Sequence, residues 1–366
     1  MRFMLIRLSF GHTAGAEFSC GKKYYSGTKG EELMEDRSKL NLSTSPFLHD
    51  QVSTPWIMYQ VVFALIPVIG AAYYFFGLST FLLCATAVAS CFATEWFFSN
   101  GRPRYKSLKD GSALITGLLL ALTLPPGFPL WMAFLGGVAS VVLGKVIWGG
   151  LGQNIFNPAL IGRAFLQAAF PTAITTWSAP DGQFFTARGA NLAIPFFQGE
   201  TVDALTGATP LAAMKFQHEA TDMMNLMMGN TAGSLGETSG LIIILVGIYL
   251  AMRKIFNWHI PVSILTATAL LSGILHLTDP AIYPSPMHMI FSGGLLLGAV
   301  FMATDPVTSP FTIKGCWIFG AGIGFLVVLI RIFGGLPEGV MYAILLMNAV
   351  TPLINRVTPY RVYGTK

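Results

Sequence analysis

The amino-acid sequence predicts an all-α, polytopic helical membrane protein with about ten transmembrane helices and one long extracytoplasmic loop. Only 11% of its 366 residues are charged and 53% are apolar, and the mean hydropathy is +0.62, whereas about 25% of the residues in a typical soluble domain are charged. Residues 51–94 and residues 111–144 contain no Asp, Glu, Lys or Arg. Since a bilayer span needs about 20 apolar residues, runs of this length exclude a soluble enzyme, a secreted disulfide scaffold and a disordered chain.

The limits of the ten spans follow from the apolar runs and the turn residues between them. Gly77, the Pro-Pro-Gly turn at 125–127 and the glycine pair at 149–150 separate neighbouring runs. The predicted spans are 57–76, 78–98, 112–124, 129–147, 155–170, 240–252, 259–277, 288–304, 315–333 and 338–354. The third, fifth and sixth are short for a full crossing, and Asn157-Pro158 predicts a break inside the fifth.

The spans divide the chain into five regions. We expect a polar cytoplasmic N-terminal region at 1–50, a first transmembrane bundle at 51–170, an outer loop at 171–239, a second bundle at 240–355 and a cytoplasmic tail at 356–366. Met34 precedes a short polar lead-in to the first span. Residues 1–33 are therefore expected to be either a disordered extension or a stretch that precedes the true start.

A weak internal similarity relates the two bundles. Gly-Leu-Leu-Leu occurs at 117–120 and again at 294–297. Each copy precedes a Gly-rich span, a Gly-Gly turn and a helix with an asparagine, Asn157 or Asn348. Repeated halves are typical of transporters, whose working site lies near the repeat interface. A true duplication and a chance similarity between two Gly/Leu-rich spans both account for the pattern.

The basic residues predict the orientation in the membrane, because Lys and Arg concentrate in cytoplasmic loops. With the N-terminus inside and ten crossings, 18 of the 22 Lys and Arg residues lie in inside segments. Arg188, Lys215 and Arg331 lie outside, and Arg163 lies within a span. Both termini are therefore predicted to be cytoplasmic, with loop 171–239 on the outer side of the membrane. The net charge of +5 reflects this sorting and does not indicate a nucleic-acid partner.

The four cysteines indicate no metal or iron–sulfur site made by this chain alone. Cys20, Cys84, Cys91 and Cys316 form neither a CxxC pair nor a Cys/His cluster. Cys84 and Cys91 are seven residues apart on one face of a predicted span, where a thiol packs as a small apolar group.

The outer loop contains the segment DALTGATPL, from Asp203 to Leu211. Thr209 followed by Pro210 predicts the start of a helix, with a hydroxyl at the N-cap and proline at the first helical position. Gly207 and Ala208 leave the backbone before it uncrowded, and a helix start attracts phosphate. A plain capped helix in a loop would account for the same residues.

Three further segments contain residue types that bind ligands. GSLGETS, from Gly233 to Ser239, offers glycines and hydroxyls, although a helix cap explains it as well. NPALIGRAF, from Asn157 to Phe165, places Arg163 at membrane depth, where a guanidinium needs a partner unless it reaches the interface. MATDPVTSP, residues 302–310, places Asp305 at the inner end of the eighth span, as a site residue or in a turn.

These segments resemble one family of membrane redox subunits. DALTGATPL is similar to the flavinylation motif Asp-x-x-Ser/Thr-Gly-Ala-Thr of the D-type subunit of the Rnf ion-translocating electron-transport complex. The same family includes the B-type subunit of the Na⁺-translocating NADH:quinone oxidoreductase. NPALIGRAF, GSLGETS, MATDPVTSP and the stretch from Pro352 to Gly364 are similar to that family too, and the resemblance covers roughly residues 40–366. The D-type subunit fits better, since its sister usually has a longer polar N-terminal region.

The resemblance implies a covalent flavin. Thr209 would be joined through its side-chain oxygen to the phosphate of FMN by a separate transferase, so that it is an acceptor and no residue here is catalytic. Asp203, Thr206, Gly207 and Ala208 would complete the motif, and Phe and Met side chains of the loop would cover the ring. We also expect flavin sites lined by Arg163, Ser234, Glu237 and Thr238, including one for a second, non-covalent flavin such as riboflavin.

The function that the resemblance implies is that of a membrane flavoprotein subunit of an ion pump. Electrons would pass between NADH and ferredoxin or quinone-type partners while Na⁺ or H⁺ crosses the membrane. The expected partners are flavin and iron–sulfur subunits and membrane lipid, with no nucleic acid. Two alternatives stay open: a solute channel or transporter built on the repeat, without a cofactor, and a passive membrane anchor for soluble redox proteins.

Overall fold

The computed structural model describes residues 53–98, 108–178, 180, 184–185, 188–193, 207–217, 221–280, 282–335 and 337–359. All the described residues belong to one compact unit within Ser53–Lys366. Within these ranges the regular structure is helical and contains no β-strand, which confirms the predicted all-α class.

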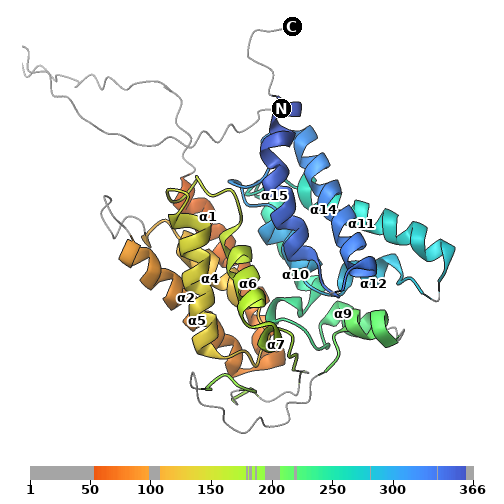
Figure 1. Cartoon of the computed structure of the whole chain (residues 1–366), viewed down its shortest axis with the longest axis horizontal. Helices are drawn as coiled ribbons and strands as arrows, with labels where there is room; N and C mark the ends of the chain where they lie inside the picture. Colours follow the sequence, from red (N-terminus) through yellow and green to blue (C-terminus); the bar gives the residue numbers. More distant parts are fainter. Residues whose placement is uncertain are drawn as a thin grey trace, which may run out of the picture. The chain divides into compact units, whose positions relative to one another are not determined.

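The first bundle contains the helices that precede the outer loop. They are α1 (Thr54–Phe76), α2 (Leu78–Phe98), α4 (Ser112–Leu122), α5 (Leu130–Val141), the π-helical turn η1 (Val142–Val146), α6 (Pro158–Ala169) and α7 (Pro171–Ile174). In Figure 1 they form the orange-to-lime group, in which α2 packs against α4 and α5 and α5 packs against α6. A Cβ on Gly117 of α4 would lie 2.6 Å from the Val88 Cα of α2. A glycine is therefore required where these two helices meet.

The loop and the second bundle follow. The loop contains α8 (Pro210–Ala212), η2 (Ala213–Gln217), α9 (Met223–Met228) and η3 (Leu235–Glu237). The second bundle contains α10 (Gly240–Met252), α11 (His259–Thr278), α12 (Pro286–Phe291), α13 (Leu295–Leu297), η4 (Gly298–Met302), α14 (Ile313–Phe333) and α15 (Val340–Val357). Helix α14 packs along α11 and α15, while α1–α10 and α6–α15 contacts join the bundles.

The helices support the prediction of a polytopic membrane protein. By length and composition, α1, α2, α11, α14 and α15 can each cross a bilayer. Shorter apolar helices cover Ser112–Leu122, Leu130–Val146 and Gly240–Met252. Together these eight correspond to eight of the ten predicted spans. The number of crossings stays a prediction, because length and apolarity alone do not place a helix across the membrane.

The fifth predicted span, 155–170, becomes helical only at Pro158, so the Asn-Pro pair is the start of a helix and not a break inside one. Helix α6 begins at Pro158, and the Asn157 side chain caps it by accepting the Ala159 N–H at 3.0 Å. The same side chain donates through Nδ2 to the Met302 carbonyl oxygen at 3.1 Å. Asn157 thus ties the start of α6 to the π-helical turn η4 of the second bundle.

The eighth predicted span, 288–304, is wrong as a single helix. Helix α12 ends at Phe291 and α13 begins only at Leu295. Arg331 of α14 donates to the carbonyl oxygens of Met289 at 2.5 Å and of Ser292 at 3.0 Å, acceptors that a continuous helix would use for its own backbone. Gly293 between them has φ +68°, a conformation that favours glycine. The break therefore has a physical cause in a side chain that arrives from another helix.

Candidate functional site

The motif threonine lies at the start of a short helical stretch, as predicted. Thr209 is the N-cap of α8, and its Oγ1 accepts the Ala212 N–H at 3.2 Å, with Pro210 at the first helical position. Thr209 is 8% exposed and Ala208 beside it is exposed. Gly207 donates its N–H to the Trp177 carbonyl oxygen at 3.1 Å. Asp203 and Thr206 lie outside the described residues.

We call residues 207–217 the Thr209 segment, and it is docked on the second bundle. Lys215 Nζ donates to the Arg331 carbonyl oxygen at 2.8 Å and to that of Gly334, at the end of α14. A Cβ on Gly293 would lie 2.6 Å from Leu211 Cδ1 and 2.9 Å from Arg331 Nη2. The segment therefore packs directly on the break between α12 and α13.

Arg163 has the buried partner that its place in a span requires. Its Nη2 lies 2.6 Å from Glu338 Oε2, and the two side chains are 9% and 20% exposed. Glu338 Oε1 also accepts the Gly294 N–H at 2.9 Å. This ion pair joins α6 of the first bundle to the residues just before α15. A charge taken out of water needs such compensation.

Glu237 lies beside this ion pair. Its Oε1 accepts from Ser234 Oγ at 2.8 Å. A Cβ on Gly294 would lie 2.7 Å from Glu338 Oε1 and 3.7 Å from Glu237 Oε1, so both carboxyl groups approach one point at the helix break. Two carboxylates this close do not both ionise readily.

The two carboxyl groups have opposite pKa shifts. Burial raises the pKa of Glu237 to about 8, and the charge of Glu338 acts in the same direction, while Arg163 and Ser234 oppose it. Burial also acts to raise the pKa of Glu338, but the Arg163 charge and the Gly294 N–H hold it below its usual value. Of the two carboxyl groups, Glu237 therefore holds a proton more readily and Glu338 ionises more readily.

The structure brings together some of the predicted site residues and separates others. Arg163, Ser234 and Glu237 meet at the break between α12 and α13. Thr238 is buried beside them in sequence, but its Oγ1 donates to the Leu235 carbonyl oxygen at 3.3 Å. Thr209 is connected to the break by the Thr209 segment, which packs on it.

Sequence reasoning did not identify Glu338 and Arg331 as site residues. The predicted span 338–354 begins at Glu338, and Arg331 falls in a predicted outer segment. The available signal was a charge at the end of each of two apolar runs, since a charge in that place needs a partner. Which partner it finds depends on contacts between residues far apart in the sequence.

A first cavity lies against the Thr209 segment. It is lined by Leu211, Met214, Lys215, Ile282, Tyr283, Pro284, Met289, Arg331, Ile332 and Pro337, and it measures about 520 Å³ including its open mouth. The walls are mostly apolar, with two cationic side chains. Ligand pockets in proteins have this mainly apolar character with a few placed charges.

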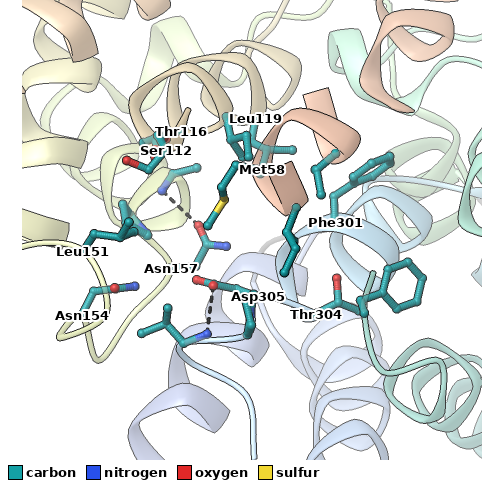
Figure 2. Close-up of a pocket in the computed structure, with 18 of the residues that line it drawn as sticks. Met58, Ser112, Thr116, Leu119, Leu151, Asn154, Asn157, Phe301, Thr304 and Asp305 are labelled. Carbon is teal, nitrogen blue, oxygen red and sulfur yellow. Dashed lines mark hydrogen bonds between the residues drawn. The ribbon is translucent and has the colours of Figure 1, made fainter. Parts of the chain in front are cut away.

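A second cavity lies between the two bundles and encloses about 840 Å³ including its open mouth. Figure 2 shows Met58, Asn157 and Asp305 in this cavity, with Asn154 and Thr304 nearby. Asp305 accepts the Val307 N–H at 3.1 Å, and burial raises its pKa to about 6. The motif MATDPVTSP therefore contributes an acidic group to a mainly apolar cavity.

The wall of this second cavity also contains a buried ion pair. Lys145 Nζ lies 2.7 Å from Glu95 Oε1 and donates to Ser112 Oγ at 2.6 Å. Apolar walls with a few converging polar groups are typical of sites for aromatic ligands and cofactors. None of the residues that line this cavity belongs to the Thr209 segment.

The described cysteines play no part in either cavity. Cys84, Cys91 and Cys316 are free and buried. Across the described ranges, no three His, Cys, Asp or Glu side chains come together as a metal site would require.

Comparison with known proteins relates the chain to membrane redox subunits. The model of the NQR2, RnfD, RnfE family matches residues 41–364. A relative from Clostridium ljungdahlii is named as the D-type subunit of a proton-translocating ferredoxin:NAD(+) oxidoreductase complex. The chain is 40% identical to it over 345 residues, which cover 92% of this chain and 99% of that protein.

Two further relatives are both named as the D-type subunit of an ion-translocating oxidoreductase complex. The protein from Stutzerimonas stutzeri is 42% identical over 326 residues, or 84% of this chain and 91% of that one. The protein from Escherichia fergusonii is 40% identical over 344 residues, or 88% of this chain and 98% of that one.

Proposed function

Since the chain belongs to the NQR2, RnfD, RnfE family, we propose that it carries FMN covalently on Thr209 and passes electrons within its complex. The chain is a membrane subunit of an ion-translocating oxidoreductase complex, as its relatives are named. The translocated ion is Na⁺ or H⁺, and electrons move between NADH and ferredoxin or quinone-type partners. Other subunits of the complex contribute flavin and iron–sulfur centres, and this chain is not catalytic in isolation.

One observation carries the assignment of Thr209: a hydroxyl inside a flavinylation-type motif, on a segment docked against the membrane bundle. The Oγ1 atom accepts one hydrogen bond, from Ala212. An ester oxygen keeps a lone pair for that bond, so attachment of phosphate is compatible with the cap. Gly207 and the exposed Ala208 carry no bulky side chain that would obstruct the phosphate.

Each part of the chain has a defined task in this proposal. FMN supplies the ability to accept and donate electrons. Lys215 holds the Thr209 segment against the end of α14. The Arg163–Glu338 pair, with Glu237 beside it, joins the two bundles where that segment is docked. The residues other than Thr209 thus position the cofactor.

We place the second, non-covalent flavin, such as riboflavin, in the cavity between the bundles (Figure 2). Its apolar wall suits an isoalloxazine ring, and Asn154, Asn157 and Asp305 offer polar groups to the polar edge of that ring. Arg163, Ser234, Glu237 and Thr238 do not line it. We therefore infer that those four residues act at the helix break and not at this second flavin.

The orientation is part of the proposal. Both termini are placed in the cytoplasm and the Thr209 segment on the outer face of the bacterial inner membrane, on the grounds of the basic residues. The cavity in Figure 2, which residues of MATDPVTSP line, would then lie near the cytoplasmic side.

A solute transporter without a cofactor is the second candidate. The cavity between the two bundles and the broken helix α12–α13 favour it, because transporters bind substrates between repeats at interrupted helices. This candidate predicts that the purified protein is colourless and moves solute without partner subunits.

Flavin fluorescence in a denaturing gel separates these candidates. The band of the wild-type chain should fluoresce, and the band of Thr209→Ala should not. Thr312→Ala is the matched control, because Thr312 is also an N-cap whose Oγ1 accepts a backbone N–H, that of Gly315 at 3.1 Å. Fluorescence that survives in Thr209→Ala, or is lost in Thr312→Ala as well, would contradict the assignment.

A further inference from the structure

The cavity beside the Thr209 segment lies close to Thr209 along the chain. Leu211, Met214 and Lys215 line it, so the helical stretch 210–217 that follows Thr209 forms part of its wall. Leu211, only two residues after Thr209, already lines the cavity. A ligand tethered at Thr209 by a chain of several bonds therefore reaches the cavity without unfolding the segment.

The opposite wall of the cavity comes from the second bundle. Met289 of α12 is 1% exposed, Arg331 of α14 is 3% exposed, and Tyr283 and Pro284 belong to the connection before α12. Aromatic, thioether and proline groups suit the flat apolar face of a large ring. The wall is held in place by Arg331, which binds the Met289 and Ser292 carbonyl oxygens.

The cavity is also cationic. The Lys215 ammonium is held by two carbonyl oxygens at the end of α14, and Arg331 lines the opposite wall. A cation fixed beside an apolar cavity favours a ligand that gains negative charge there, because its interaction with that charge is poorly screened. A flavin ring gains negative charge when it accepts electrons.

We propose that the isoalloxazine ring of a flavin attached at Thr209 sits in this cavity, with Lys215 facing the ring and raising its reduction potential. The inference rests on the proposed attachment at Thr209. The tethered ring thereby has a site of its own, separate from the cavity between the bundles. Lys215 has two tasks, since the ammonium that docks the segment on α14 also stabilises the reduced ring.

Two substitutions test the site from different sides. Met214→Trp fills the cavity with a large side chain, and Lys215→Met removes the cation while keeping a long apolar side chain. Met252→Trp is a matched control at a position 79% exposed, and Lys314→Met is a matched control at the opposite end of α14. Lys215→Arg keeps the charge, so it separates loss of the cation from damage to the segment.

The measurements are made on the complex purified from membranes. Fluorescence in a denaturing gel reports attachment, and steady-state anisotropy and emission of the flavin in the native complex report whether the ring is held. In Met214→Trp we expect full attachment with lower anisotropy and stronger emission, because the ring is displaced into water. Met252→Trp should match the wild type.

Redox titration of the attached flavin completes the test. Lys215→Met should shift the equilibrium toward the oxidised ring by about tenfold, or about 30 mV for a two-electron couple. Lys215→Arg and Lys314→Met should leave the midpoint potential near that of the wild type. Attached flavin whose anisotropy, emission and potential are unchanged in Met214→Trp and Lys215→Met would overturn the ring site and leave attachment intact. Absence of flavin from the wild-type chain would overturn both.

Discussion

The ion pair between Arg163 and Glu338 allows a quantitative test of how the two bundles are joined. The pair is 2.6 Å long, and its side chains are 9% and 20% exposed. Removal of one partner of a buried pair costs about 3–5 kcal/mol, because the remaining charge is left uncompensated. Here the cost depends on Glu237, a second carboxyl group at the same helix break.

The substitution Glu338→Gln is expected to cost less than an isolated buried pair would. It removes the negative charge that helps to raise the pKa of Glu237, whereas Arg163 still lowers that pKa. Glu237 then ionises near neutral pH and partly compensates Arg163, so we expect a loss of about 2 kcal/mol. Glu237→Gln replaces a protonated carboxyl by an amide of similar shape and should cost less than about 1 kcal/mol.

The double substitution is the decisive comparison. With both carboxyl groups replaced, Arg163 has neither partner, and we expect a loss of about 3–5 kcal/mol, more than the sum of the single losses. The assay is the free energy of unfolding in mixed micelles titrated with a denaturing detergent at pH 7. Glu95→Gln is the control, because it breaks the other buried pair, Lys145–Glu95 at 2.7 Å, and should cost about 3–5 kcal/mol alone. Additive losses for the two glutamates would refute the reasoning.

Three further outcomes are expected. The folded-state pKa of Glu237, about 8, lies above that of an unfolded carboxyl, about 4.3. The free energy of unfolding should therefore fall as the pH rises from about 5 to 8, by up to about 1.4 kcal/mol per pH unit. Glu237→Gln should flatten that slope. Gly293→Ala places a side chain at φ +68° and 2.6 Å from the Thr209 segment. It should lower the unfolding free energy by about 1–3 kcal/mol, whereas Gly273→Ala, in ordinary contact at 3.5 Å, should not. Labelling of intact cells with a membrane-impermeant maleimide should modify Gln217→Cys and spare Lys314→Cys; the reverse pattern would invert the proposed orientation.

The sequence predicted most of what depends on neighbouring residues. Long apolar runs predicted α1, α2 and α14 within a few residues, because a bilayer span requires such a run. The hydroxyl-proline pair predicted the cap at Thr209, whereas the Asn-Pro pair, interpreted as a break, is the capped start of α6. The cap acts within about one helical turn, and each apolar run acts within a single helix.

The parts that were missed depend on distant residues. The Arg163–Glu338 contact joins positions 175 residues apart, and no local pattern indicates which acid an arginine in a span will meet. The break after α12 depends on Arg331, which is 39 residues beyond Ser292. Gly293 and Gly294 were visible in the sequence, but glycines are common in packed spans as well as at breaks. Only the approach of Arg331 and the two carboxyl groups to Gly293 and Gly294 identifies these glycines as a helix break.

Peptide mass spectrometry of the chain purified from its native membrane tests the central proposal most directly. Cleavage after Arg188 and Lys215 releases a peptide, residues 189–215, that contains the whole motif. We expect it to carry the added mass of FMN less one water, with fragment ions that place the addition on Thr209. An unmodified peptide, or an addition on Thr206, would contradict the assignment.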